Sequence, residues 1–238
     1  MNENCKHIEL GFYNFLISLN GEVRLLKIEV WSDFICPYCY KGKRILEDAI
    51  SKFKYRDEIE IIYRSYILSP DASKENHQLV NDMLLTKYGM SMEEINAENQ
   101  RLIKKAKTLG LDYSRINNLY DINTFDAHRV AHYAKKHNLS LEWTETLMDA
   151  HFVKGLLIDD HEVLISLAKQ IGLNELTVRS ILQTNQYGSD VRQDMAEADT
   201  IGVETVPFFA INRSYAISGV VTSKEFLDAI NLAYEQNK

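Results

Sequence analysis

The chain has 238 residues, 45% of them hydrophobic and 26% charged, with a formal net charge of −7 and a sequence pI near 5.5. This composition is typical of an ordinary globular protein, and an acidic balance without a basic stripe argues against binding to nucleic acid or to an anionic membrane surface. No apolar run approaches the ~18 residues of a transmembrane helix, and three cysteines are too few for a secreted disulfide scaffold.

Residues 1–25 do not fit the domain that the rest of the chain predicts. The apolar run 8–19 lacks a basic leader and a small-residue cleavage site, so we do not interpret it as a secretory signal, and we expect a cytoplasmic protein. Two explanations of this extension stay open. In the first, it forms a short strand pair around the Asn20-Gly21 turn. In the second, it lies outside the native protein and translation starts at Leu26, which the minor bacterial start codon TTG can encode.

The first strongly patterned stretch joins a strand, two cysteines and a helix. Residues 26–31 are rich in β-forming residues and predict a strand. Cys36 and Cys39 follow, separated by Pro37 and Tyr38, and after them apolar residues recur at three- and four-residue steps, as on one face of a helix. A C-x-x-C between a strand and a helix is the sequence pattern of a thioredoxin-like redox site.

The spacing of the two cysteines has a physical reason. With Cys36 as the N-cap, Pro37 takes the first helical position, where its missing N–H is no loss and its fixed φ suits the helix. The sulfur of Cys36 is then expected to face the free amides of Tyr38 and Cys39 at the positive end of the helix dipole, which favours the thiolate. We therefore predict that Cys36 is the attacking and more exposed thiol, and that Cys39 is the resolving one.

A zinc half-site is the main alternative for these two cysteines, and it needs two further ligands. The remaining cysteine is Cys5, and the nearest histidine pair at helical spacing, His128 and His132, lacks the glutamate of the H-E-x-x-H pattern. We therefore predict a redox dithiol and no bound metal.

The middle of the chain predicts a second strand and then a long run of helices. Residues 59–66 have the strand pattern, and a strand–helix–strand unit with a right-handed crossover makes this strand a parallel neighbour of the first. From there to residue 187, apolar residues at helical spacing and glycines at segment ends predict six helices. Residues 69–187 are therefore predicted to form a helical insertion domain.

From residue 188 the pattern returns to strands and helices. A helix ending at Gly202 precedes a strand at 206–211, a short partner at 215–217 and a last helix. The predicted fold class is α/β: a thioredoxin-like fold, built from residues 26–68 and 188–238, that is interrupted by a large all-α insertion domain.

Pro207, one of only three prolines, stands at the head of a predicted strand, directly after Val206. A proline there cannot donate to a strand ladder, so its position needs a reason. We predict a cis peptide bond that faces the C-x-x-C pair, as at this place in thioredoxin-like folds, with the Val206 backbone offered to an extended substrate chain. The alternative is a trans proline that merely starts an edge strand.

Three segments, IEVWSDFICPYCYKGKR, NTFDAHR and TVPFFAINRSYAISGV, resemble the DsbA family of thiol–disulfide oxidoreductases, in its FrnE-like cytoplasmic branch. The resemblance implies oxidoreductase or disulfide-isomerase activity on proteins or small disulfides, with Cys36, Cys39 and Pro207 as the redox site. The family's usual Pro-Trp spacer is Pro37-Tyr38 here, and DsbA itself has a histidine in place of Tyr38. Since tyrosine is uncharged, the resemblance implies a dithiol that is less oxidising than that of DsbA.

Two further polar positions belong to these segments. His128, beside Asp126, is predicted to lie on a helix start that lines the groove over the dithiol, or else this stretch is only a capped helix end. Asp33 either relays a proton to Cys39 or only orders its loop. The predicted substrate contacts are Pro37, Tyr38, Val206 and His128.

The predicted function is that of a cytoplasmic thiol–disulfide oxidoreductase or protein disulfide isomerase, acting through a mixed disulfide at Cys36 that Cys39 resolves, without a metal or organic cofactor. Its predicted partners are the thiols and disulfides of proteins or small molecules, and the chain is expected to be a monomer or a homodimer. Two alternatives stay open. A glutathione-dependent isomerase of the 2-hydroxychromene-2-carboxylate isomerase type resembles this architecture but typically carries serine in place of Cys36, and a peptide-binding, chaperone-like module would survive the loss of both thiols.

Overall fold

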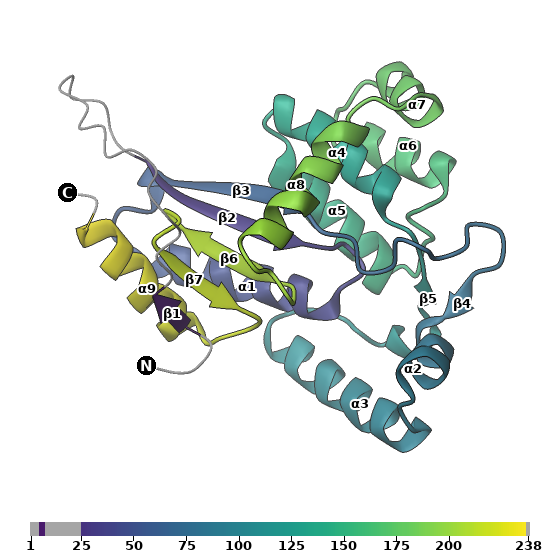
Figure 1. Ribbon diagram of the computed structural model, residues 1–238, viewed down its shortest axis with the longest axis horizontal. Helices are drawn as coiled ribbons and strands as arrows, with labels where there is room; N and C mark the ends of the chain where they lie inside the picture. The colour runs from purple at the N-terminus through teal and green to yellow at the C-terminus, as the bar shows by residue number, and fades with distance from the viewer. Residues whose placement is uncertain (1–4, 8–24, 237–238) are drawn as a thin grey trace.

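The fold is organised around one mixed β-sheet. The computed structural model describes residues 5–7 and 25–236, and within them the sheet has five strands in the order β1-β7-β6-β2-β3 (Figure 1). The strands are β1 (Cys5–His7), β2 (Leu26–Ser32), β3 (Ile59–Ser65), β6 (Phe208–Ile211) and β7 (Tyr215–Ser218).

Strand β2 has a neighbour on each side, and the chain leaves its carboxyl end toward helix α1 (Pro37–Lys52). The crossover through α1 makes β3 a parallel neighbour of β2, with Ser32 opposite Ser65 at the end of the pair, while β6 runs antiparallel to β2 on the other side. The residues that follow Ser32 therefore emerge beside the start of β6, which is where a site can form.

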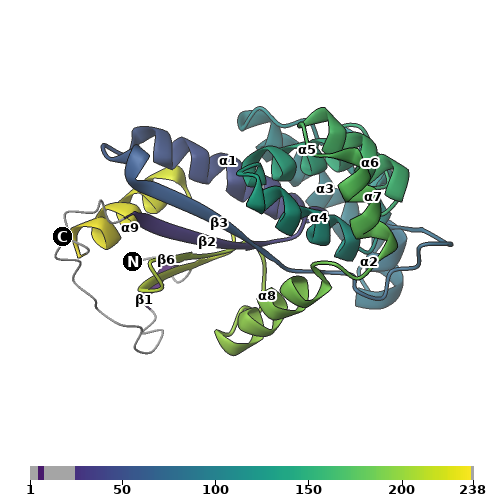
Figure 2. The same cartoon turned by 90° about the horizontal axis from the view of Figure 1, so that it is seen from above.

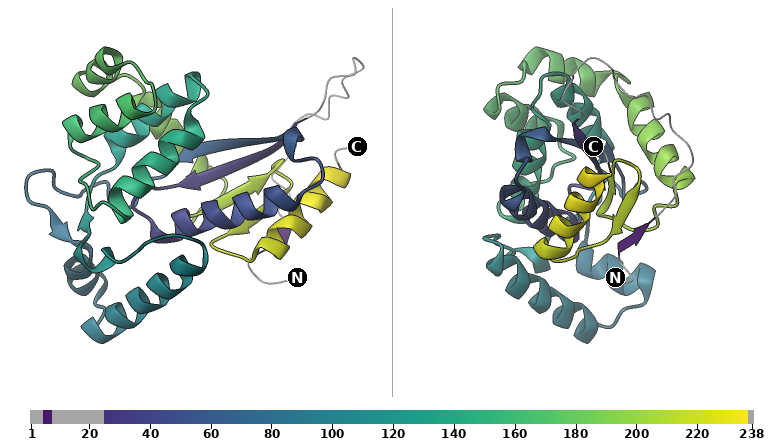
Figure 3. Two further views of the ribbon diagram at one scale, coloured as in Figure 1. Left: turned by 180° about the vertical axis from the view of Figure 1, so that it is seen from behind. Right: turned by 90° about the vertical axis from the view of Figure 1, so that its left-hand side faces the viewer.

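The two faces of the sheet are covered by different helices. Alternation along β2 sends Ile28 and Val30 to one face and Glu29 and Trp31 to the other. Helix α1 and helix α9 (Ser223–Glu235) cover the first face and lie side by side in Figure 3. Helix α8 (Gly188–Thr200) covers the second face (Figure 2), where the indole N–H of Trp31 donates to the Asp194 carbonyl at 3.0 Å.

Charged groups also tie the second face of the sheet to its surroundings. The buried carboxylate of Glu29 accepts hydrogen bonds from Arg64 of β3, at 2.6 Å, and from Arg213 of the β6–β7 turn, at 2.5 Å. Arg64 also pairs with Asp194 of α8 at 3.0 Å. Because buried charges are stable only when paired and hydrogen-bonded, this network fixes where α8 sits on the sheet.

The helical insertion lies at one end of the sheet, beyond the carboxyl end of β2 (Figure 1). The predicted thioredoxin-like fold with a large helical insertion is confirmed, and the structure has helices where the periodicity predicted the six of the insertion. They are α2 (Val80–Tyr88), α3 (Met92–Thr108), α4 (Phe125–Lys136), α5 (Ser140–Phe152), α6 (His161–Gln170) and α7 (Glu175–Gln183). Short 3-10 turns lie at Ile116–Asn118 in the insertion and at Arg56–Glu58 between α1 and β3.

Two short strand pairings differ from the expectation. Strands β4 (Gln78–Leu79) and β5 (Tyr120–Asp121) pair antiparallel inside the insertion, which was expected to be helical throughout. Strand β1, in the extension that was not expected to join the core, pairs antiparallel with β7 at the sheet edge. Strands of two or three residues carry too little alternation to be recognised in a sequence. The turn expected at Asn20-Gly21 lies outside the described residues.

In the described part of the chain, no helix combines the length and the apolarity that are needed to span a membrane.

The boundaries of the insertion, at residues 69 and 187, stay a prediction.

Candidate active site

The two cysteines lie where the chain passes from β2 to α1. Cys36 is the N-cap of α1, Pro37 is its first residue, and the N–H of Cys39 donates to the Cys36 carbonyl at 3.0 Å. Both side chains are free thiols, with 4% of Cys36 and 2% of Cys39 exposed. The difference in exposure that the sequence analysis expected is therefore small.

The thiol of Cys36 points to a backbone carbonyl. It donates to the oxygen of Val206 at 3.6 Å, and within the described residues it makes no N-cap hydrogen bond to α1. The contact with helix amides that the sequence analysis expected is thus not formed. A protonated thiol is a weak donor and only a weak acceptor, so it turns to a carbonyl, whereas a thiolate would accept strongly from the amides.

Cys39 is held in the thiol form. Burial raises the pKa of Cys39 well above its usual range, and the neighbouring sulfur of Cys36 raises it further. Hydrogen bonds from the Ser32 side chain and the Asp33 backbone act in the opposite direction but are weaker. A buried thiol keeps its proton because a thiolate loses more hydration energy on burial. Cys39 is therefore a poor nucleophile until something removes its proton.

The segment that begins β6 lies against the first turns of α1. The Val206–Pro207 peptide bond is cis, and the Val206 carbonyl is the acceptor for the Cys36 thiol. The ring of Pro207 lies close to Gly42 of α1. A Cβ atom added to Gly42 would lie 2.9 Å from Cγ of Pro207, which is closer than Cβ atoms approach other heavy atoms in real structures. Glycine at position 42 thus lets α1 approach Pro207.

Two residues of the insertion hold the spacer between the cysteines. The hydroxyl of Tyr113 donates to the carbonyl of Pro37 at 2.7 Å, and the hydroxyl of Tyr38 donates to Glu98 of α3 at 2.5 Å. The sequence analysis missed Tyr113 and Glu98, because they are 76 and 60 residues away from their partners in the chain. Burial raises the pKa of both tyrosines, so each hydroxyl stays a donor.

A third residue of the insertion binds the outer side of α1. Glu145 of α5 accepts from Tyr40 at 2.6 Å and from Lys43 at 2.6 Å, and it pairs with Arg44. Burial alone would raise the pKa of Glu145, but the hydrogen bonds from Arg44, Lys43 and Tyr40 outweigh it and lower this pKa to about 2. The carboxylate is therefore charged at neutral pH and anchors α1 to the insertion.

A buried polar cluster lies next to the dithiol. Asp33 is fully buried, and its Oδ2 accepts from the N–H of Leu68 at 2.7 Å. Its Oδ1 lies 3.6 Å from Nε2 of His128, and within the described residues neither of these atoms, nor Nε2 of His151, has a hydrogen-bond partner. Burial lowers the pKa of His151 to about 4. Asp33 thus orders its loop, and one of its oxygens stays available for a proton.

Charged side chains at the start of α4 connect it to other segments of the insertion. Asp126 bonds to Arg129 at 2.8 Å, to Lys74 at 2.7 Å and to His161 at 2.9 Å. Arg129 also donates to the carbonyl of Gln186 at 2.9 Å, between α7 and α8. Asp126 and Arg129 are therefore occupied in holding the insertion together.

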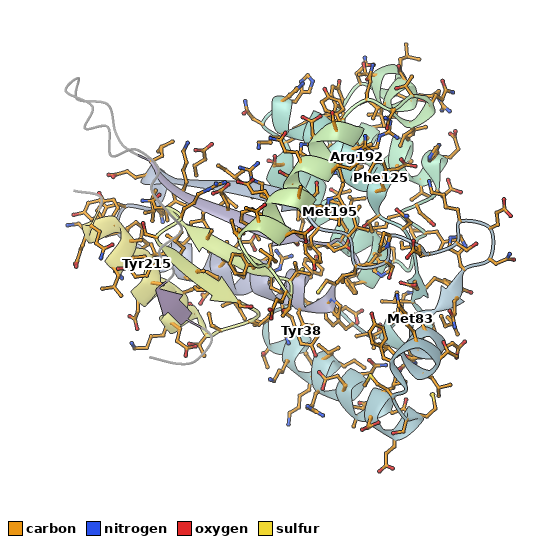
Figure 4. The ribbon with its side chains drawn as sticks, viewed as in Figure 1. Tyr38, Met83, Phe125, Arg192, Met195 and Tyr215 are labelled. Atoms are coloured by element: carbon orange, nitrogen blue, oxygen red, sulfur yellow. The ribbon has the colours of Figure 1, made fainter. Side chains whose placement is uncertain are left out.

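An open cavity of about 470 Å³ begins at Cys36 and extends between α1 and the insertion. Three of the predicted substrate contacts line it, namely Pro37, Tyr38 and Val206. Figure 4 labels Tyr38, near the start of α1, and Met83 of α2, which faces the same cavity. His128 lies elsewhere, with Ser32 and Phe34 in the lining of a separate and much smaller cavity.

Among the side chains of residues 25–236, no group of three histidine, cysteine, aspartate or glutamate residues lies close enough together to hold a metal ion.

Comparison with known proteins identifies similar chains. The family model described as "DSBA-like thioredoxin domain" matches residues 27–231. An uncharacterised protein of Bacillus subtilis (strain 168), YwbO, is 29% identical over 205 residues, which cover 86% of this chain and 95% of that protein. The crystal structure of a probable DsbA oxidoreductase from Streptomyces coelicolor is 35% identical, covers 90% of this chain and 92% of its own, and superposes with a TM-score of 0.85.

A more distant structure shares the fold. The cytosolic disulfide reductase DsbM from Pseudomonas aeruginosa is 15% identical, with 89% of this chain and 98% of that chain covered, and has a TM-score of 0.60. DsbM has also been solved with glutathione.

Proposed function

We propose that this chain, which belongs to the family of DSBA-like thioredoxin domains, is a thiol–disulfide oxidoreductase whose reacting groups are Cys36 and Cys39. One observation carries the proposal: two free thiols lie in the first turn of a helix, and one of them forms part of the wall of an open cavity. The family supplies the class of reaction. The arrangement of the two sulfurs supports the assignment of their roles.

In the proposed reaction, the thiolate of Cys36 attacks a substrate disulfide. The substrate S–S bond breaks, one substrate sulfur leaves as a thiolate, and the other forms a mixed disulfide with Cys36. The free amides at the start of α1 can stabilise the charge on Cys36 before attack. Cys39 then attacks the Cys36 sulfur and releases the second substrate thiol, so that two electrons pass from the dithiol to the substrate.

The second step needs a proton acceptor, because Cys39 is held as a thiol. We assign this role to Asp33, whose backbone contacts the Cys39 sulfur and whose Oδ1 has no hydrogen-bond partner within the described residues. His128, 3.6 Å from that oxygen, is a positioning residue for the carboxylate in this scheme. The alternative role of Asp33, loop ordering through Leu68, is compatible with it.

The proposed setting is the cytoplasm, where the dithiol acts on protein or small-molecule thiols and disulfides without a metal or organic cofactor. The similarity in fold to a cytosolic disulfide reductase that has also been solved with glutathione supports this setting. Membership of the FrnE-like branch is part of the same proposal. Whether the chain oxidises, reduces or isomerises disulfides in the cell depends on its reduction potential against that of its compartment.

The test is the reduction potential of the Cys36–Cys39 pair together with alkylation mapping. We expect a potential between those of thioredoxin and DsbA, roughly −270 to −120 mV, because no charged spacer residue adds to the effect of the helix end. Brief alkylation at neutral pH should modify Cys36 before Cys39. Modification of Cys39 first would reverse the assigned roles.

Single-cysteine variants separate the proposal from its alternatives. Cys36→Ser should abolish disulfide exchange, whereas Cys39→Ser should trap partners on Cys36 because the resolving thiol is gone. A peptide-binding module would keep its binding in Cys36→Ser. A glutathione-dependent isomerase of the 2-hydroxychromene-2-carboxylate type would retain activity in that variant, since its relatives typically carry serine at this place.

A further inference from the structure

Helix α1 carries two buried lysines, Lys41 and Lys43, whose surroundings differ. Each of them is 4% exposed. The ammonium group of Lys43 lies 2.5 Å from Glu47 and 2.6 Å from Glu145. Within the described residues, no carboxylate lies within salt-bridge distance of the Lys41 ammonium group, which instead lies 4.8 Å from the centroid of the Tyr38 ring. Lysine is rarely buried without an anionic partner, because a charge that leaves water loses its hydration.

The side chain of Lys41 runs along α1 toward Cys36. Helical side chains point back toward the N-terminus of their helix, and the ring that the Lys41 ammonium group contacts belongs to Tyr38, two residues after Cys36. Burial lowers the pKa of Lys41 and Lys105 lowers it further, whereas charge on Glu98 and on Cys36 acts in the opposite direction. Because electrostatic interactions are mutual, the Lys41 ammonium group in turn favours a negative charge on Cys36.

The carboxylate of α3 that acts on Lys41 has bonds of its own. Glu98 accepts from Tyr38 at 2.5 Å and pairs with Arg101 at 2.9 Å. Its charge is shared among these groups and is only partly available to Lys41.

Lys41 also faces an open groove of about 750 Å³, which includes Lys105 of α3 and Val206. The acidic residues that line this groove are engaged elsewhere, since Asp48 pairs with Lys52 and Glu225 caps helix α9. The groove therefore adds a like charge near Lys41 and leaves its ammonium group to act on the sulfur at the start of the helix.

The cavity that begins at Cys36 brings uncharged and acidic groups to the sulfur. Burial raises the pKa of Tyr38, Tyr113 and Cys39, so each keeps its proton, and it lowers the pKa of His151 to about 4, so this imidazole is neutral. Four carboxylates belong to the cavity lining or to the turn before Cys36, namely Asp33, Glu98, Asp121 and Glu204. They oppose a negative charge on the sulfur, which makes a nearby cation the more effective.

We propose that Lys41 is the counter-charge of the Cys36 thiolate: its ammonium group, buried without a salt-bridge partner in the described chain, stabilises the reacting sulfur when this sulfur loses its proton. The inference rests on the proposed function, in which Cys36 attacks as a thiolate. Lys41 acts through Cys36 and is therefore a positioning residue. Because it stabilises the reduced form, it also makes the dithiol more oxidising.

The test compares three variants of the whole chain with the wild-type protein. Lys41→Met removes the charge and keeps a long, flexible side chain, whereas Lys41→Arg keeps the charge. The matched control, Lys52→Met, removes one positive charge from the other end of α1, where the side chain is 54% exposed and pairs with Asp48. The rate of Cys36 alkylation by uncharged iodoacetamide is measured from pH 4 to pH 9, with the modified cysteine mapped by mass spectrometry.

We expect the difference to depend on pH. On the acidic side of the profile, where only part of Cys36 is ionised, Lys41→Met should react about three- to tenfold more slowly than the wild-type protein, as expected for the loss of one charge close to a buried sulfur. At the alkaline end the rates should converge, because ionisation no longer limits them. Lys41→Arg should stay within about twofold of the wild-type rate at every pH, and Lys52→Met should leave the profile unchanged.

A redox equilibrium tests the same inference without alkylation. When the reduced protein is mixed with glutathione disulfide, the Cys36–Cys39 disulfide forms and two glutathione thiols are released. Loss of the counter-charge destabilises the dithiol, so the equilibrium constant in this direction should rise about threefold in Lys41→Met and stay the same in Lys52→Met. The oxidised form of Lys41→Met should resist urea at least as well as the wild-type protein, since an apolar side chain replaces a buried charge.

Two results would overturn the inference and leave the proposed function intact. One is an unchanged pH profile and equilibrium constant in Lys41→Met. The other is an equal loss of rate at every pH together with no recovery in Lys41→Arg, which would mean a general disturbance of the site. If Lys41→Met does not fold, Lys41→Gln, which is neutral but polar, has the same expected results. If Cys36 of the wild-type protein is not alkylated before Cys39, the roles in the proposed function fail.

Discussion

Helix α1 is held in different ways on its two sides. Toward the sheet and α9 it buries apolar side chains, among them Leu46 and Ala49, in a core with Phe209. Toward the insertion Tyr40 stacks on Phe152, and its other contacts are mainly hydrogen bonds and ion pairs, of which the largest group converges on Glu145. The spacer carbonyl that Tyr113 binds belongs to this second side.

The difference shows how the two parts of the molecule divide their tasks. Apolar burial is strong but non-directional, so it keeps α1 on the sheet without fixing the orientation of its first turn. Hydrogen bonds have a preferred geometry and hold individual groups in place. The apolar core therefore keeps α1 on the sheet, and the insertion orients the turn that carries the two sulfurs.

The largest expected effect comes from the apolar side. Leu46→Ala removes a side chain that is 1% exposed, and the free energy of unfolding should fall by about 2–5 kcal/mol. Because the hydrogen bonds at the spacer are untouched, the reduction potential should stay the same. Denaturant unfolding gives the first quantity, and equilibration with glutathione redox buffers gives the second. A large change in the reduction potential of Leu46→Ala would mean that the apolar side of α1 also orients the turn that carries the two sulfurs.

On the other side of α1, Glu145→Gln keeps the shape of the side chain but removes the charge that Lys43 and Arg44 share. Hydrogen bonds to charged groups contribute about 1.5–3 kcal/mol, and Glu145 is partly exposed, so we expect a loss of about 1–2 kcal/mol in the free energy of unfolding. The side chain of Lys43 is 4% exposed, and among the described residues it would keep Glu47 alone as an anionic partner.

The same variant should change how stability depends on pH. The pKa of Glu145 is lowered to about 2 from its ordinary value of 4.5, so its contribution is present above 4.5 and is lost as the pH falls toward 2. Between these values the wild-type protein should lose stability more steeply than Glu145→Gln. Urea titrations at pH 5 and pH 3 measure this loss. If the free energy of unfolding falls equally in the wild-type protein and in Glu145→Gln between these pH values, the Glu145 carboxylate does not cause the pH dependence.

Gly42→Ala tests a close approach rather than burial or hydrogen bonding. Alanine usually favours a helix over glycine by about 1 kcal/mol, but here the new Cβ would lie 2.9 Å from Pro207 and 3.1 Å from Phe209. Overpacking of this kind costs about 1–3 kcal/mol, so the net change in stability should be a small loss. The shift of the Pro207 segment away from α1 should slow disulfide exchange, which a stopped-flow assay measures. An unchanged rate would mean that the segment adapts without moving the Val206 carbonyl.

The smallest change in stability should come from Tyr113→Phe. It removes one hydrogen bond to the Pro37 carbonyl, which contributes about 0.5–1.5 kcal/mol. If that bond differs in strength between the dithiol and disulfide forms, the reduction potential should move by about 10–30 mV, since 30 mV corresponds to ~1.4 kcal/mol for a two-electron couple. A structural role alone would lower stability and leave the potential where it was.

Local patterns predicted the parts of the site that are close in sequence. The C-x-x-C pair between a strand and a helix and Pro207 before a strand both follow from rules of a few residues. The contacts made by Tyr113, Glu98 and Glu145 could not be predicted in this way, because each depends on how the insertion packs against α1. Their sequence surroundings show only ordinary helix and loop residues.

The orientation of the Cys36 side chain could not be predicted from the sequence either, for a different reason. A sequence places Cys36 at an N-cap, but whether its sulfur turns to the helix amides or to a carbonyl depends on its proton and on the position of Val206, 170 residues away. The place of His128 also depended on packing, because its ring lies against Phe34, with centroids 4.4 Å apart, rather than on the cavity wall.

The two tryptophans of the chain give each part of the molecule its own optical signal. Trp31 lies in β2 and Trp143 in α5; both are fully buried, and both indole N–H groups donate to backbone carbonyls, those of Asp194 and Ala127. Buried indoles emit at short wavelength and are shielded from aqueous quenchers. The variants Trp31→Phe and Trp143→Phe would each leave a single emitter, so red shifts at one common denaturant concentration would mean that sheet and insertion melt together, and separate shifts would mean that they melt apart.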